Sequence, residues 1–219
     1  MLTENWFLER ILFWIPLLLS LTVHEWAHAW SAYRLGDPTA EREGRLTLNP
    51  LAHMDPIGTL LVPLLAPFGW AKPVPINIGL FHSKVGMRTG VMLVAAAGPV
   101  SNICIALLSI AILVGWAFLC GSVELIPVSV YSLLNTAIWL NVLLAVFNMI
   151  PIPPLDGSRI VDALMPDRLR GIWDAFRGLG PIALAAVVVG LALGGSQWLW
   201  WPIQTVQLAV EELLQLVTR

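Results

Sequence analysis

Long apolar runs constrain the fold of this chain more than any other feature, because about 20 consecutive apolar residues have the length of a helix that crosses a bilayer. Four runs of this kind occupy residues 11–32, 89–121, 131–150 and 181–200. Hydrophobic residues make up 58% of the chain and charged residues only 12%, whereas about 25% of residues are charged in a soluble domain. The sequence therefore predicts an all-α, polytopic membrane protein with about four full transmembrane helices.

The segments between these runs refine the expected architecture. Residues 57–70 are apolar but short and contain Pro63 and Pro67, so we expect a re-entrant or interfacial segment there. Gly44–Asn49 is expected to form a short β-strand or hairpin. We expect a single integral-membrane domain over residues 1–219, with a core at about 11–160, a C-terminal helix at 181–200 and a tail at 201–219.

The distribution of positive charge predicts an orientation in the membrane. Ten of the twelve Lys and Arg residues fall in three polar connections, residues 33–56, 71–88 and 156–180. If residues 57–70 re-enter, all three connections lie on one side, which the positive-inside rule makes cytoplasmic. The net charge of −2 offers no basic surface, so we expect no nucleic-acid partner. The compact chain fits a protein of a prokaryotic cell membrane.

The first apolar run contains the motif His24-Glu25-Trp-Ala-His28. Positions i and i+4 share one face of a helix, so two imidazoles can bind one metal ion with the glutamate beside them as a base. The motif begins thirteen residues after Ile11, a helical rise of about 20 Å, so we expect it inside the membrane or near its far edge. An ionisable residue there costs about 2.5–3.5 kcal/mol, and a bound divalent cation would compensate for the cluster. The alternative is that both histidines only hydrogen-bond to neighbouring helices.

A catalytic zinc normally needs a third protein ligand, and Asp156 is the best candidate. It follows the run at 131–150 after a proline-rich stretch that ends the helix. With one re-entrant segment, the runs alternate in direction so that His28 and Asp156 lie toward the same membrane face. The alternative is an ordinary helix-end residue before Gly157.

Three motifs together resemble the site-2 protease family of intramembrane metalloproteases. They are His24-Glu25-x-x-His28, the small-residue segment Ala97-Gly-Pro-Val-Ser-Asn102, and Asn148-x-x-Pro-x-Pro-x-Leu-Asp156-Gly157. Their order is that of the family, and they cover roughly residues 20–160. No segment of the chain has the size of a PDZ domain, so it resembles the minimal members.

The resemblance implies membrane helices around one buried zinc ion and cleavage of transmembrane or membrane-associated proteins within the bilayer. It implies His24, His28 and Asp156 as zinc ligands and Glu25 as the catalytic base. Asn148 and Asn102 would help position the substrate or stabilise the reacting carbonyl.

Several functional assignments stay open at this point. A membrane metal-ion transporter or channel could use the His/Asp cluster as a transit site, although a single site and Glu25 favour the protease. His53 could gate access to the active site, and Gly44–Asn49 could pair with an unwound substrate by strand addition. The chain could act alone, as a homodimer or with a regulatory membrane partner.

Overall fold

The computed structural model describes residues 4–65, 69–82, 84–192 and 197–218, and every regular element in these ranges is helical. The α-helices are α1 (Glu4–Arg34), α2 (Thr39–Arg42), α3 (Val62–Leu65), α4 (Met87–Cys120), α5 (Val128–Asn148), α6 (Asp156–Leu164), α7 (Arg170–Gly178), α8 (Gly180–Ala192) and α9 (Gln197–Val217). Single turns of other helix types are η1 (Pro50–Ala52), η2 (Pro56–Leu61), η3 (Ile78–Leu80), η4 (Val123–Leu125) and η5 (Asp167–Leu169).

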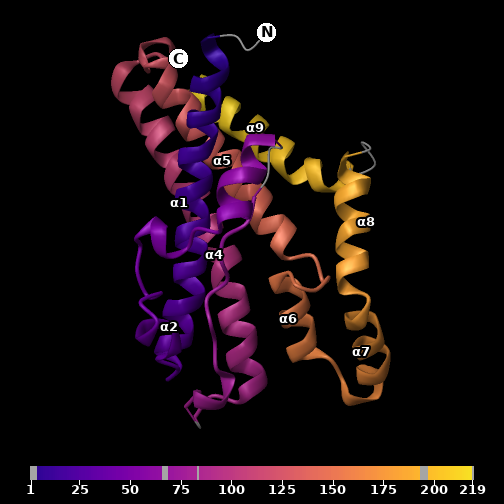
Figure 1. Cartoon of the computed structure of the whole chain (residues 1–219). Helices are drawn as coiled ribbons and strands as arrows, with labels where there is room; N and C mark the ends of the chain where they lie inside the picture. The colour runs from indigo at the N-terminus through magenta and orange to yellow at the C-terminus, as the bar shows by residue number, and fades with distance from the viewer. Residues whose placement is uncertain (1–3, 66–68, 83, 193–196, 219) are drawn as a thin grey trace.

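Helices α1, α4 and α5 pack side by side and form the body of the molecule (Figure 1). α4 also contacts α6, and α9 crosses α4 and α5 near the end where α1 begins. Apolar side chains buried between these helices form the core, among them Leu17, Leu113, Ile138 and Leu140. α4 ends at Cys120, and the next residue, Gly121, has a φ of +70°, the left-handed conformation typical of a glycine that terminates a helix.

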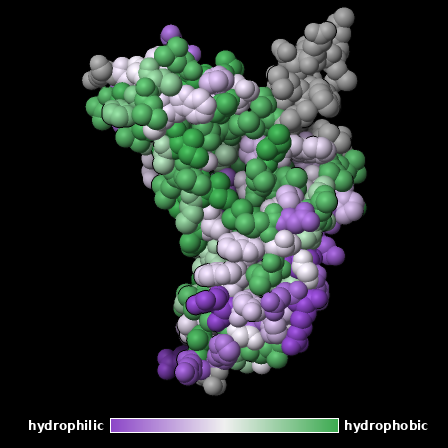
Figure 2. Space-filling model, turned by 90° about the vertical axis from the view of Figure 1, so that its left-hand side faces the viewer, coloured by the Kyte–Doolittle hydropathy of each residue, from purple (hydrophilic) through white to green (hydrophobic). Residues whose placement is uncertain are grey.

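The outer surface of the bundle suits a lipid environment. Hydrophobic residues cover the upper part of Figure 2, and hydrophilic residues gather at the lower end. Among the described residues, α4 and α5 are long and apolar enough to cross a membrane, and η5–α7 with α8 could form a third, bent span. The prediction of a membrane-type helical fold is therefore confirmed, whereas the expected four full spans are not.

The described parts of the predicted re-entrant segment, residues 57–65 and 69–70, are hydrogen-bonded to each other. The backbone N–H of Trp70 donates to the carbonyl of Gly58 at 3.1 Å, and the Thr59 hydroxyl donates to the Trp70 carbonyl at 2.8 Å. Just outside this pair, the N–H of Lys72 donates to the carbonyl of His53 at 2.9 Å. Both ends of the segment therefore lie together, while residues 66–68 with Pro67 lie outside the described part of the chain, so re-entry stays a prediction.

The prediction of a strand or hairpin at Gly44–Asn49 is wrong, since no residue of this segment forms a β-ladder. The Arg45 side chain is buried, and its guanidinium donates to the carbonyl of Lys72 at 2.6 Å. The Thr47 hydroxyl accepts the N–H of Asn49, whose side chain in turn caps η1. These side-chain contacts with the backbone satisfy groups that a strand would need for pairing.

The C-terminal region also differs from the expected helix and tail. Residues 180–192 form α8, and most of the expected tail belongs to α9. Ile203, Val210 and Leu214 of α9 are buried, the last two in the same apolar cluster as Leu113 of α4. This apolar stripe is the reason why residues 201–217 pack as a helix against the bundle.

Candidate metal centre

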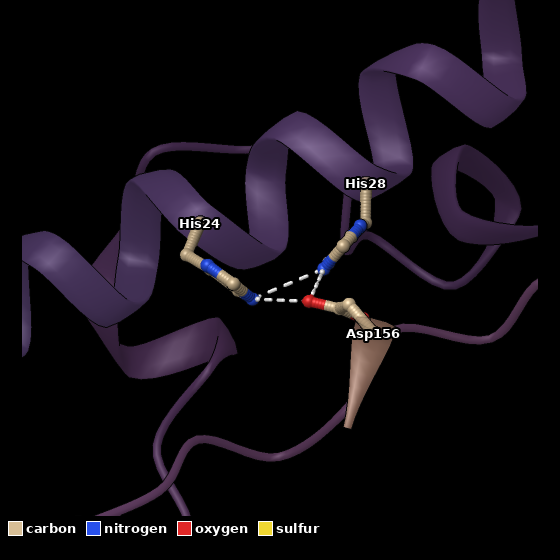
Figure 3. A group of neighbouring side chains, drawn as sticks. All are labelled: His24, His28 and Asp156. Carbon is tan, nitrogen blue, oxygen red and sulfur yellow. Dashed lines mark hydrogen bonds and ion pairs between the residues drawn. The ribbon is translucent and has the colours of Figure 1, made fainter. Parts of the chain in front are cut away.

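Three side chains converge between α1 and the start of α6 (Figure 3). α1 presents His24 and His28 on one face, with their Nε2 atoms 3.0 Å apart. Asp156 Oδ2 lies 3.2 Å from each of these two atoms. All three residues are buried. The candidate ligands expected from the sequence therefore do lie together, although Asp156 is more than 120 residues from the two histidines along the chain.

The turn after α5 delivers Asp156 to this place. α5 ends at Asn148, the prolines that follow prevent its continuation, and Asp156 is the first residue of α6. A Cβ on Gly157 would lie 2.2 Å from the carbonyl oxygen of Met149. Only glycine therefore fits where the start of α6 lies against the end of α5, which accounts for the Asp-Gly pair.

The hydrogen bonds of the two imidazoles fix which nitrogen faces the centre. His24 Nδ1 lies 2.7 Å from the side-chain oxygen of Asn102, and His28 Nδ1 lies 2.7 Å from the backbone carbonyl oxygen of Val94. An oxygen acceptor at Nδ1 requires a proton there, so each neutral imidazole turns an unprotonated Nε2 toward the other.

This donor set fits a zinc ion. Two Nε2 lone pairs and Asp156 Oδ2, which is buried and accepts no hydrogen bond, face one another at 3.0–3.2 Å. Three lone-pair donors repel unless a cation lies among them. Ligand atoms of a tetrahedral zinc lie about 3.3 Å apart at bond lengths of about 2.0–2.1 Å. Imidazole ligands whose other nitrogen donates to an oxygen are also typical of zinc sites.

Gly98 of α4 lies directly against the histidine pair. A Cβ at this position would be 2.5 Å from both His24 Cε1 and His28 Nε2. The absence of a side chain therefore leaves the space in which the two imidazoles approach each other. The sequence analysis recognised Gly98 only as part of a small-residue segment. It did not predict that Gly98 lies next to His24 and His28.

Glu25 follows His24 on the same turn of α1 and is half-buried. Its Oε2 accepts the backbone N–H of Val74 at 2.9 Å. Residues 71–77 run past this point without regular structure, and their contact with Glu25 gives no sequence signal because it depends on a backbone group.

The other residues expected at the site lie in different settings. Asn102 is fully buried, and its amide binds both His24 and Asn141. Asn148 is partly exposed at the end of α5, where its Nδ2 donates to the carbonyl of Leu144. His53 is buried, and its Nε2 lies 2.8 Å from the carbonyl oxygen of Thr47, a contact within the loop before η2.

Sequence reasoning missed the part that Asn141 takes in this centre. It is fully buried in α5 and contacts Asn102 and Ser20. Asn141 is one of three asparagines inside the apolar run 131–150, and no local pattern specifies its partners, which are 39 and 121 residues away.

Comparisons with known proteins agree with these features. The profile of "Peptidase family M50" matches residues 120–177. The chain is 40% identical over 187 residues to the Bacillus subtilis protein named "Putative zinc metalloprotease YwhC", covering 85% of this chain and 83% of the relative. It is 33% identical to "Putative zinc metalloprotease Rip2" of Mycolicibacterium smegmatis, covering 72% of this chain and 59% of that protein. Rip2 of Mycobacterium tuberculosis strain Erdman is 30% identical, with 84% of this chain and 70% of that protein covered. No solved structure matches significantly.

The chain therefore belongs to peptidase family M50, the site-2 protease family, as its three motifs predicted. Membership of this family makes it an enzyme of the metalloprotease class.

Proposed function

We propose that this protein is an intramembrane zinc endopeptidase that hydrolyses peptide bonds of transmembrane or membrane-associated proteins, as in regulated intramembrane proteolysis. One observation carries the proposal: His24, His28 and Asp156 form a buried ligand set among helices whose outer faces are apolar. The names of the bacterial relatives support zinc as the metal. The described residues contain one candidate ligand cluster, which corresponds to one ion per chain.

The roles of the site residues follow from their chemistry. His24, His28 and Asp156 would hold the metal and leave a further position for water or substrate. Zinc, when bound, supplies a Lewis acid that lowers the pKa of a coordinated water to about 7 and polarises the scissile carbonyl. Glu25 accepts the proton of the attacking water and passes it to the nitrogen of the leaving amine, so that no proton is gained or lost. The N–H of Val74 holds one oxygen of the Glu25 carboxylate beside the ligand pair.

The two motif asparagines have different environments and separate roles. Asn148 is partly exposed and its amide has a second N–H, with which it can donate to the reacting carbonyl. Asn102 is buried with both ends of its amide bound, which favours a role inside the protein over contact with substrate. His53 as a gate stays a prediction, and its buried contact with Thr47 favours a role in holding the loop.

The orientation in the membrane follows from charge. The end of α1, the start of α4 and the α6–α7 connection lie at the lower end of Figure 1, where hydrophilic residues gather in Figure 2. The positive-inside rule assigns this end to the cytoplasm. α1 begins and α9 ends at the opposite end. We therefore assign a multi-pass protein of a prokaryotic cell membrane whose active site opens toward the cytoplasmic side.

Cleavage of a transmembrane peptide in proteoliposomes tests the proposal. The wild type should contain one zinc per chain and cut within the apolar segment of the peptide, as located by mass spectrometry. Glu25→Gln should keep its zinc and lose activity by about 10²–10⁴-fold, the usual contribution of a general base. Glu124→Gln is the matched control, because Glu124 lies in η4, far from the ligands along α4, and should leave both readouts unchanged.

Two outcomes would contradict the proposal. If the wild-type protein retains no zinc, the proposal loses its basis. Zinc-loaded wild type that cuts water-soluble peptides but no peptide in a bilayer would assign the protein to ordinary metalloproteolysis at the membrane surface.

A further inference from the structure

A chain of buried amides leads away from the metal centre and ends on the main chain of α5. His24 Nδ1 contacts Asn102 Oδ1 at 2.7 Å, and Asn102 Nδ2 donates to Asn141 Oδ1 at 2.8 Å. Asn141 Nδ2 then donates to the backbone carbonyl of Ala137 at 2.8 Å. Asn102 and Asn141 are both fully buried, so no solvent competes for these groups. The chain connects α1, α4 and α5 through side-chain hydrogen bonds.

The orientation of each amide in this chain follows from its far end. A backbone carbonyl can only accept, so the Asn141 group next to Ala137 must be the NH2 group. Ser20 agrees with this assignment, because its hydroxyl donates to the carbonyl of Pro16 at 2.6 Å and its oxygen accepts from Asn141 Nδ2 at 2.8 Å. Asn141 Oδ1 must then face Asn102, and a flipped Asn102 amide would bring two oxygens together.

The orientation of the Asn102 amide also determines which ring nitrogen of His24 carries the proton. With its NH2 group bound to Asn141, Asn102 turns its oxygen to His24, whose Nδ1 must carry the proton. The Nε2 lone pair is then free for the metal. If the Asn102 amide flipped, its NH2 group would face Nδ1 and favour the tautomer with hydrogen on Nε2, which cannot bind a metal ion.

We infer that Asn141 is a positioning residue for the metal centre: it fixes the amide of Asn102, which in turn holds His24 in its metal-binding tautomer. This inference rests on the proposed zinc site and adds a residue outside the three sequence motifs. His28 needs no such device, because its Nδ1 binds the backbone carbonyl of Val94, a group that can only accept.

We call this path from Asn141 through Asn102 to His24 the relay. Zinc affinity in detergent, measured by competition with a fluorescent chelator, tests it. Loss of an outer-shell partner weakens metal binding by about 10–100-fold, and we expect Asn141→Leu to fall in this range. Asn135→Leu is the matched control on the same helix: Asn135 is half-buried, and the same substitution there should leave the affinity within about twofold of wild type, the usual error of additivity.

A second substitution separates the relay from a general packing role. Asn102→Leu removes the amide through which Asn141 acts, so His24 Nδ1 loses its acceptor and this variant should itself bind zinc more weakly. In that background Asn141→Leu should have no further effect beyond about twofold. If Asn102→Leu fails to fold, Asn102→Ala serves as the background, because the effect of Asn141 should likewise vanish once the amide is gone.

The outcomes distinguish the relay from the proposed function. Unchanged zinc affinity of Asn141→Leu, or an undiminished effect of Asn141→Leu in both backgrounds, would overturn the relay. The absorption of bound Co²⁺ gives an independent readout, since a changed donor set at His24 should alter the d–d bands of Asn141→Leu and leave those of Asn135→Leu unchanged. Because these readouts are independent of proteolysis, an inactive but zinc-binding wild type would count against the proposed function alone. A wild type with no zinc affinity would overturn both.

Discussion

The metal-binding core and the C-terminal arm of this protein are built from different kinds of contact. The core comprises α1, α4, α5 and the start of α6, and several of its polar side chains are buried and hydrogen-bonded to specific partners, as in the chain from His24 to Ala137. The arm, η5 with α7 and α8, is mostly exposed: Trp173 is the one buried residue of α7, and the described side chains of α8 beyond Gly180 are not buried. The core should therefore respond to single substitutions far more strongly than the arm.

Removal of a ligand should give the largest effect. Asp156→Ala leaves two facing Nε2 atoms without the carboxylate that lies 3.2 Å from both. We expect zinc affinity to fall by more than about 100-fold, because even outer-shell changes cost about 10–100-fold. Chelator competition measures the loss, and Asp174→Ala, an exposed aspartate of α7, is the control in the arm. Retention of full zinc affinity by Asp156→Ala would remove Asp156 from the ligand set.

A single methyl group in the core should have the next largest effect. Gly98→Ala would put its Cβ 2.5 Å from His24 Cε1 and His28 Nε2, so the imidazoles must move apart. We expect loss of zinc binding and a destabilisation of about 1–3 kcal/mol, as for other overpacked sites. Gly115→Ala is a matched control on the same helix, since its Cβ would meet nothing within 4 Å. It should be neutral or stabilising by up to about 1 kcal/mol in thermal unfolding. If Gly98→Ala and Gly115→Ala have the same zinc affinity and the same thermal stability, α4 can move away from the imidazoles to make room for the methyl group.

A polar contact in the arm should matter less and only locally. Asp162 of α6 accepts hydrogen bonds from Trp173 Nε1 and the Arg177 guanidinium, both at 3.1 Å, and so ties α7 to α6. Asp162→Ala should cost about 1 kcal/mol, the net value of a typical hydrogen bond. Limited proteolysis between α6 and α7 should accelerate, while zinc affinity stays within about twofold of wild type. A loss of zinc affinity here would show that the arm supports the metal centre.

The sequence predicted the convergence of His24, His28 and Asp156 better than the contacts around them. His24 and His28 belong to one local motif, and Asp156 was chosen because it follows the proline-broken end of the 131–150 run, with the directions of the apolar runs in support. Asn141 gave only a weak signal, because its partners are set by the way α1, α4 and α5 pack. The wrong strand at Gly44–Asn49 has the same cause, since Arg45 reaches the distant carbonyl of Lys72.

The C-terminal helix shows where a closer reading of the sequence could have done better. The polar residues of 201–219 suggested a tail, yet Ile203, Val210 and Leu214 recur at the spacing of one helical face and are buried. Amphipathic periodicity therefore carried the signal for α9. The packing of this helix against α4 and α5 depends on tertiary contacts that composition does not reveal.

The smallest effect is expected at the ion pair that links the start of α4 to the arm. The Arg88 guanidinium donates to Asp167 at 2.7 Å, but both side chains are largely exposed, at 59% and 80%. Water and salt screen such a pair, and ordering two exposed side chains offsets most of the attraction. Arg88→Ala should therefore leave thermal unfolding, zinc affinity and cleavage unchanged at physiological salt, with any difference from wild type confined to low ionic strength. A large loss of cleavage with intact zinc binding would mean that this contact controls how the arm closes on the site, and would break the contrast between a sensitive core and a tolerant arm.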